Sequence, residues 1–138
     1  MADRVKKVDY CYISVPNRPG QGARLLGALR DSGVNMLAYS GFPAKAGKAQ
    51  IDLVVEKLAP LRKIAKKNNW RLSKPKKGIL VQGPDRLGAV HRHIQKLAAK
   101  KINITAADAV SAGKGRYGMI LWVKPKDLGR AARALKAR

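Results

Sequence analysis

Two short stretches decide how this sequence folds: Val15-Pro16-Asn17-Arg18-Pro19-Gly20 and Gly83-Pro84-Asp85-Arg86-Leu87-Gly88, which lie 68 positions apart. The 68-residue register superposes a proline, an arginine and a glycine of the two stretches without a gap. Repeats at a fixed spacing indicate duplicated structural units. The sequence therefore predicts two copies of one small module. The same register also aligns Leu29 with Leu97, Asn35 with Asn103, Gly47 with Gly115, Leu53 with Leu121 and Val55 with Val123.

Each copy is expected to contain a strand, a helix, two strands and a second helix. Short β-favourable runs that end at turn residues predict the opening strands, and apolar residues three and four apart predict the helices that follow. Turns that contain glycine predict a hairpin in each copy, and runs of good helix formers predict a second helix at the end of each copy. The expected strands cover 10–15, 34–42, 49–56, 78–82, 102–110 and 117–124, and the expected helices cover 24–32, 60–67, 89–100 and 126–136.

This element order predicts an α+β fold of two ferredoxin-like βαββαβ modules in tandem, covering 1–75 and 76–138. Right-handed crossovers would place both helices of a module on one face of its sheet. The second copy ends at Arg138 directly after its helix, so it lacks its last strand. Because an unpaired strand edge is a liability, we expect Trp70–Ser73 to pair with both opening strands in one shared sheet.

The charge of the chain is strongly positive. Thirty Lys and Arg residues against 8 Asp and Glu residues give a formal charge of +22, which favours attraction to polyanions. Spread over the whole chain, such charge also fits a generally basic, solvated surface. The densest acid-free block lies between Lys57 and Pro84. Its candidate polyanion contacts are Arg62, Lys63, Lys66, Lys67, Arg71, Lys74, Lys76 and Lys77.

The hydrophobic content and the single cysteine indicate where the protein is located and whether it contacts a membrane. Hydrophobic residues make up 46% of the chain, enough for a core, but the apolar runs are too short to span a bilayer. The charged N-terminal sequence lacks the apolar stretch of a secretory signal, and the single Cys11 cannot form an intrachain disulfide. We expect a cytoplasmic protein without membrane contact.

The two loop stretches, followed by Gly33-Val34-Asn35 in the first copy and Lys101-Ile102-Asn103 in the second, resemble the ACT domain twice over. The resemblance covers roughly residues 8 to 137. It implies modules that sense small molecules, most often amino acids, commonly at an interface between modules. Without a catalytic domain, the chain is similar to stand-alone tandem ACT regulators, which implies a non-catalytic regulatory protein with a regulated protein partner.

The loop residues suit an amino-acid ligand. A glycine turn that opens a helix presents free N–H groups to a carboxylate, while Asn or Asp oxygens can accept hydrogen bonds from an ammonium group. The carboxylate of Asp85 is the stronger ammonium partner. Alternatively, these residues only shape the turns. The candidate ligand-binding residues are Asn17, Arg18, Gly20, Asn35, Asp85, Arg86, Gly88 and Asn103.

The sequence gives little support to catalysis. His91 and His93 are two apart on a helix and point in different directions, so no metal site is expected. Cys11 alternates within an apolar strand and is expected in the core. We therefore predict no enzyme activity, metal or cofactor.

Aromatic residues on the sheet leave two alternatives open. Tyr10 and Tyr12 share one face of the first strand, which could be a stacking platform for RNA or a surface buried in a homodimer, and we favour the homodimer. The alternative function is that of a basic accessory protein that binds nucleic acid through the Lys57–Lys77 surface.

Overall fold

The computed structural model describes residues 2–138 as one six-stranded sheet with four α-helices. The strands follow one another across the sheet in the order β2-β3-β1-β4-β6-β5. This order confirms the predicted fold class of ferredoxin-like modules and the shared sheet. The elements are β1 (Arg4–Pro16), α1 (Gln21–Asp31), β2 (Met36–Pro43), β3 (Lys48–Val55), α2 (Leu58–Lys67), β4 (Lys76–Pro84), α3 (Ala89–Ala99), β5 (Ile104–Gly113), β6 (Arg116–Val123), the short 3-10 helix η1 (Pro125–Asp127) and α4 (Leu128–Ala134).

The chain forms two compact units. The first unit is Asp9–Lys76, and the second unit combines Lys77–Arg138 with the N-terminal segment up to Val8. The sequence suggested a division into 1–75 and 76–138, which differs from the structure mainly at the N-terminus. Because β1 is 13 residues long, its first part belongs to the second unit and its remainder to the first.

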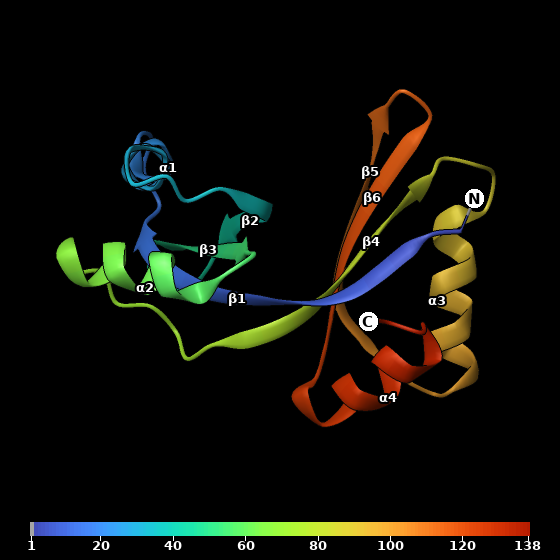
Figure 1. The fold of residues 1–138 in the computed structure, drawn as a ribbon. Coiled ribbons are helices and arrows are strands. Elements are labelled where there is room, and N and C mark those ends of the chain that lie inside the picture. Colours follow the sequence, from blue (N-terminus) through green and yellow to red (C-terminus); the bar gives the residue numbers. More distant parts are fainter. Residues whose placement is uncertain (1) are drawn as a thin grey trace. The chain divides into compact units, whose positions relative to one another are not determined.

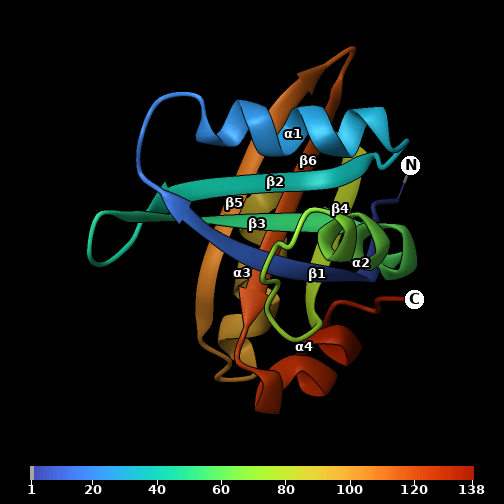
Figure 2. The same ribbon diagram turned by 90° about the vertical axis from the view of Figure 1, so that its left-hand side faces the viewer.

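In the first unit, both helices pack on one face of the sheet, and Figure 2 shows α1 and α2 on the same side of β1, β2 and β3. Strand β3 pairs with β1 and β2 in antiparallel fashion. Because strand side chains alternate between faces, every second residue of β1 and β3 reaches the helices. The resulting core contains Cys11, Ile13, Ile51, Leu53 and Val55 from the strands and Leu25, Leu29, Leu61 and Ile64 from the helices.

The second unit repeats this arrangement, with α3 and α4 on one side of β4, β5 and β6 (Figure 1). Strand β6 pairs with β4 and β5 in antiparallel fashion. Its core joins Ile79 and Val81 of β4, alternate residues of β6, Leu97 of α3 and Leu135 after α4. Val5 of β1 belongs to this core as well, so the N-terminal segment is a structural part of the second unit.

Backbone hydrogen bonds reproduce the 68-residue register. The amide of Asn17 donates to the carbonyl of Gly47 at 2.9 Å. At the corresponding positions, the amide of Asp85 donates to the carbonyl of Gly115 at 2.8 Å. Each bond ties the loop before a helix to the tip of the hairpin that follows it, so the two copies share their loop architecture.

The prediction that Trp70–Ser73 forms a shared strand is wrong. Residues 70–75 form no strand, and the Ser73 amide donates to the carbonyl of Tyr12 at 2.9 Å on one side only. The Tyr12 amide in turn donates to the Ser73 hydroxyl, and Pro75 has no N–H to extend a ladder. Strand β1 itself extends back to Arg4 and is the neighbour of β4 in the sheet.

Candidate functional site

A cavity of about 280 Å³ lies in the first unit where α1 begins. Because β1 ends and β2 and β3 form their hairpin at this edge of the unit, residues from separate elements meet there. The residues that line it include Asn17 and Arg18 of the loop, Gln21 and Gly22 of α1, and Tyr39 and Phe42 of β2.

A matching cavity of about 300 Å³ lies in the second unit where α3 begins. Adding 68 to the residue numbers converts much of the first lining into the second, for example Asn17 into Asp85 and Phe42 into Val110. The two cavities are therefore equivalent places in the duplicated module. The corresponding side chains here are Asp85, Arg86, Gly88, Val90, Val110 and Ser111.

Both helices begin at a glycine in the left-handed region. Gly20, which precedes α1, has φ 90°, and Gly88, which precedes α3, has φ 77°. Neither helix has a side-chain hydrogen bond that caps its start. The first N–H groups of a helix have no partner within the helix and carry partial positive charge. The amides of Gln21 and Ala89 already donate to the carbonyls of Arg18 and Arg86. The donors that each helix start offers to a carboxylate are therefore the amides of the two residues that follow.

The two cavities differ in their acceptors. In the second unit, the Ser111 hydroxyl donates to Asp85 at 2.9 Å and holds this exposed carboxylate at the cavity. In the first unit, the neutral Asn17 occupies the matching place. A Cβ on Gly22 would lie 3.3 Å from the Tyr39 hydroxyl, so Tyr39 lies closely over the start of α1. The second cavity is thus the better match for a ligand with an ammonium group.

Three sequence-predicted residues, Gly20, Asn35 and Asn103, do not line either cavity. Gly20 directly precedes α1, but Asn35 and Asn103 follow the C-terminal ends of α1 and α3, whereas the cavities lie at the helix starts. Each helix has 11 residues, and at 1.5 Å per residue its two ends are about 16 Å apart. The loop residues are brought together, but the asparagines are not.

A second group of polar residues surrounds Asp3, whose side chain is only 2% exposed. Its Oδ2 accepts hydrogen bonds from Arg92 at 2.7 Å, His93 at 2.6 Å and Tyr117 at 2.5 Å. Arg86 lies 3.9 Å from Oδ1. This Asp3 cluster links the N-terminal segment to α3, β6 and the β4–α3 loop. No local sequence pattern could have found it, because its bonds join residues 89 to 114 positions apart.

The environment of Asp3 favours its charged form. Burial acts to raise the pKa of Asp3, but hydrogen bonds from Tyr117, His93 and Arg92 outweigh burial and lower it. Burial, together with the bond to Asp3, raises the pKa of Tyr117 above its usual range. Asp3 is therefore ionised, and its carboxylate bonds the N-terminal segment to α3 and β6.

The basic segment lies mostly on the exposed side of α2 and in the chain that follows. All eight predicted polyanion contacts, Arg62, Lys63, Lys66, Lys67, Arg71, Lys74, Lys76 and Lys77, are exposed.

The predicted tyrosine platform is partly covered. The Lys76 ammonium lies 5.7 Å from the centre of the Tyr12 ring, within reach of a cation–π contact. Burial raises the pKa of Tyr10 to about 12. Tyr10 and Tyr12 are both half-buried, so they do not present an open stacking surface.

The remaining candidates behave as structural residues. Cys11 is buried in the core, as predicted. His91 is exposed and His93 belongs to the Asp3 cluster. Within residues 2–138, no group of three His, Cys, Asp or Glu side chains is placed to hold a metal ion. None of the described helices has the length and hydropathy of a membrane-crossing segment.

The fold resembles that of several solved structures at low sequence identity. Protein BT0572 from Bacteroides thetaiotaomicron aligns with a TM-score of 0.78 and 16% identity over 97% of this chain and 88% of that chain. The ligand-free regulatory subunit of aspartate kinase from Thermus thermophilus aligns with a TM-score of 0.61 and 16% identity over 98% and 93%. The aspartokinase alpha and beta subunits align with a TM-score of 0.59 and 16% identity over 98% and 95%. No family model and no curated protein matches the sequence.

These likenesses concern the fold. Among the neighbours is a regulatory subunit of aspartate kinase, whose fold this chain shares over nearly its whole length.

Proposed function

We propose that this chain is a non-catalytic regulatory protein that binds an amino acid at the cavity beside Asp85. The observation that carries the proposal is the combination of a helix start without a side-chain cap and an exposed carboxylate at one cavity of about 300 Å³. A free amino acid needs both partners, donors for its carboxylate and an acceptor for its ammonium group. The fold of regulatory subunits supports a role in regulation.

The structure suggests how the ligand would be held. Its carboxylate would accept hydrogen bonds from the N–H groups of Val90 and His91, because the Ala89 amide already donates to the carbonyl of Arg86. Gly88 leaves the backbone open to close approach. Its ammonium group would donate to Asp85, which Ser111 holds in place. Small or apolar side chains would face Val90 and Val110, which line the same cavity.

Calorimetric titration with each of the twenty amino acids tests this proposal. We expect one or a few to bind, and Asp85→Asn to weaken the best ligand about tenfold or more, because a hydrogen bond to a charged group is lost. The amide oxygen of Asn can still accept the Ser111 hydrogen bond, so the loop should keep its shape. Unchanged affinity in Asp85→Asn would contradict this site.

The first unit provides a matched control. Asn17→Asp gives its cavity the carboxylate that the second unit already has. If the ammonium partner decides binding, this variant should add a second, weaker site to the titration. The regulated protein partner and the homodimer stay predictions, and sedimentation with and without the ligand tests both.

A nucleic-acid-binding function is the competing proposal, favoured by the exposure of the eight basic residues on α2 and in the chain that follows. Binding to phosphates releases counterions, so affinity for an oligonucleotide should fall steeply as salt rises. Amino-acid binding at Asp85 should change much less. Tight, salt-sensitive oligonucleotide binding without any amino-acid binding would favour the competing function.

A further inference from the structure

A cavity of about 610 Å³ lies in the second unit between the N-terminal segment, α3 and the chain after α4. Backbone bonds fix its walls, because the Arg138 amide donates to the carbonyl of Val5 at 3.0 Å and the Lys7 amide donates to the carbonyl of Arg138 at 3.4 Å. Volumes of 300 to 1,000 Å³ are typical of small-molecule sites. This cavity does not include Asp85, so it is separate from the proposed amino-acid site.

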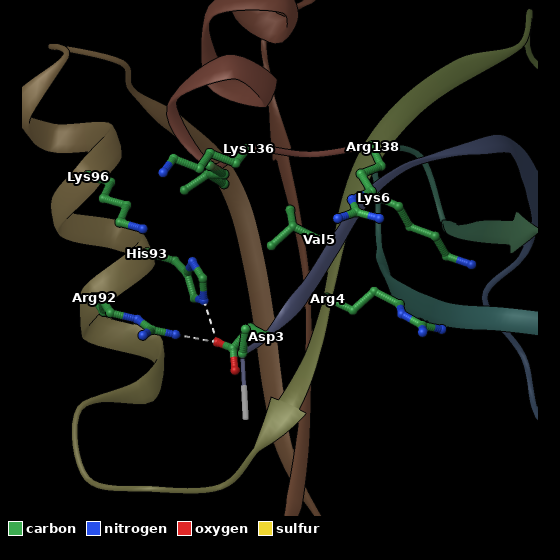
Figure 3. A pocket seen from close by; sticks show the side chains of 11 residues that line it. Asp3, Arg4, Val5, Lys6, Arg92, His93, Lys96, Lys136 and Arg138 are labelled. Atoms are coloured by element: carbon green, nitrogen blue, oxygen red, sulfur yellow. Dashed lines mark hydrogen bonds and ion pairs between the residues drawn. The ribbon is translucent and has the colours of Figure 1, made fainter.

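Positive side chains line this cavity in excess. Arg92 and Lys96 come from α3, and Lys136 and Arg138 come from the chain after α4. In Figure 3, Lys96 and Lys136 extend toward each other from neighbouring backbone segments. Within the described residues, Asp3 is the one acidic side chain that lines the cavity, and it is already bonded to Arg92. Besides Arg92, five cationic residues line the cavity without a carboxylate partner among the described residues: Arg4, Lys6, Lys96, Lys136 and Arg138.

His93 supplies an observation that does not depend on surface charge. Its side chain is 3% exposed, and its Nε2 bonds to Asp3 at 2.6 Å. Its other nitrogen, Nδ1, is buried and has no hydrogen-bond partner among residues 2–138. Figure 3 shows the Nδ1 edge of the ring facing the side on which Lys96 and Lys136 lie. Buried polar atoms are rarely left without partners, so this nitrogen points to a missing ligand atom.

We propose that this cavity binds an anion that carries a diphosphate or triphosphate group. Lysine and arginine side chains are the usual partners of phosphate oxygens, and several cations in one cavity match several negative charges. A single carboxylate would leave most of this charge unbalanced. Nδ1–H of His93 would donate to one phosphate oxygen while Nε2–H keeps its bond to Asp3, so both ring nitrogens would carry a proton in the complex.

Calorimetry with inorganic pyrophosphate and with ATP tests the proposal at physiological salt. Equal affinity for both would assign the site to the phosphate chain alone, and tighter binding of ATP would assign it to a nucleotide. Both results support a phosphate site. Absence of binding for both compounds at millimolar concentration would overturn it.

Two double variants separate the cavity from general charge attraction. The double variant Lys96→Gln and Lys136→Gln should weaken binding about tenfold or more, because two charged contacts are lost. The double variant Lys63→Gln and Lys67→Gln removes the same charge beside another cavity, of about 530 Å³, whose lining contains no histidine. It should bind pyrophosphate as the unaltered protein does. An equal loss in both variants would overturn the proposal.

The two histidines give a direct readout that needs no variant. In protein with ¹⁵N-labelled histidine, pyrophosphate should shift the Nδ1 resonance of His93. Exposed His91, two residues earlier on α3, should not change. Pyrophosphate binding that leaves the Nδ1 resonance of His93 unchanged would refute the site. The site would also be refuted if an oligonucleotide bound more tightly than pyrophosphate and lost affinity in the double variant of Lys96 and Lys136.

Discussion

Replacing Asp3 with asparagine tests whether the Asp3 cluster stabilises the second unit. The carboxylate is 2% exposed and accepts three hydrogen bonds on one oxygen. The Arg92 side chain is 43% exposed, so water can replace that partner at little cost. His93 and Tyr117 are buried, and each would lose a bond to a charged acceptor. At about 1 to 2 kcal/mol for each buried donor, Asp3→Asn should lower the free energy of unfolding by about 2 to 4 kcal/mol.

The assay should report on each unit separately, and the two tryptophans allow this. Trp70 lies in the first unit and Trp122 in the second. With 5-fluorotryptophan in both positions, ¹⁹F spectra recorded through a urea titration follow the two units in one sample. We expect Asp3→Asn to move the Trp122 transition to lower urea.

Asp31→Asn is the matched control. Asp31 pairs with Arg30 at 3.0 Å, but both side chains are more than two-thirds exposed, at 69% and 79%. Such surface pairs contribute about 0 to 1 kcal/mol. If Asp3→Asn and Asp31→Asn have the same small effect on Trp122, the stabilising role of the cluster is refuted.

The pH dependence has a definite sign. The pKa of Asp3 is lowered in the folded protein from its ordinary 3.8, so its stabilisation is complete above that value. It is lost as the pH falls through the lower, folded pKa. The stability difference between the unaltered protein and Asp3→Asn should therefore shrink in strong acid.

Three further predictions concern single residues. Gly83→Ala should lower the free energy of unfolding, measured by urea titration, by about 1 to 3 kcal/mol, because its Cβ would lie 2.0 Å from the Asp3 carboxylate. Gly118→Ala is the control and should change this free energy by less, because the nearest atom to its Cβ would be 3.9 Å away. Gly88→Ala should cost about 1 to 2 kcal/mol through its φ of 77° alone, and a thermal transition at or above that of the unaltered protein would contradict this. Tyr10→Phe should remove an ionisation near pH 12 from the ultraviolet titration, and an unchanged high-pH curve would argue against burial of this hydroxyl.

The repeat made most of the fold predictable. Once Asn17 and Asp85 were aligned, the same pattern of strands and helices could be predicted in both halves. Turn residues and apolar spacing determine strands and helices through neighbours a few residues apart, and such neighbours are visible in the sequence. The N-terminal part of β1 was missed for the same reason. Arg4-Val5-Lys6-Lys7-Val8 contains too few apolar residues to indicate a strand, and only its place beside the second unit explains why Val5 and Val8 are buried.

The candidate site was predictable to a smaller extent. Loop residues next to a helix start are close in sequence, so Asp85, Arg86 and Gly88 could be grouped correctly. Asn103 was expected at the same place, but the length of α3 separates it from the loop. Asp3 could not be linked to its partners, since nothing in the sequence near it points to residues around a hundred positions away.

The position of the N-terminal segment has a consequence for how the chain is made and folded. During synthesis, this segment leaves the ribosome well before its partners on α3 and β6. The bond from Tyr117 to Asp3 closes a loop of 114 residues, and such distant contacts slow folding. The Asp9–Lys76 unit lies between these partners in the sequence, so the nascent chain contains all strands and helices of that unit while the segment before it still waits for its own partners.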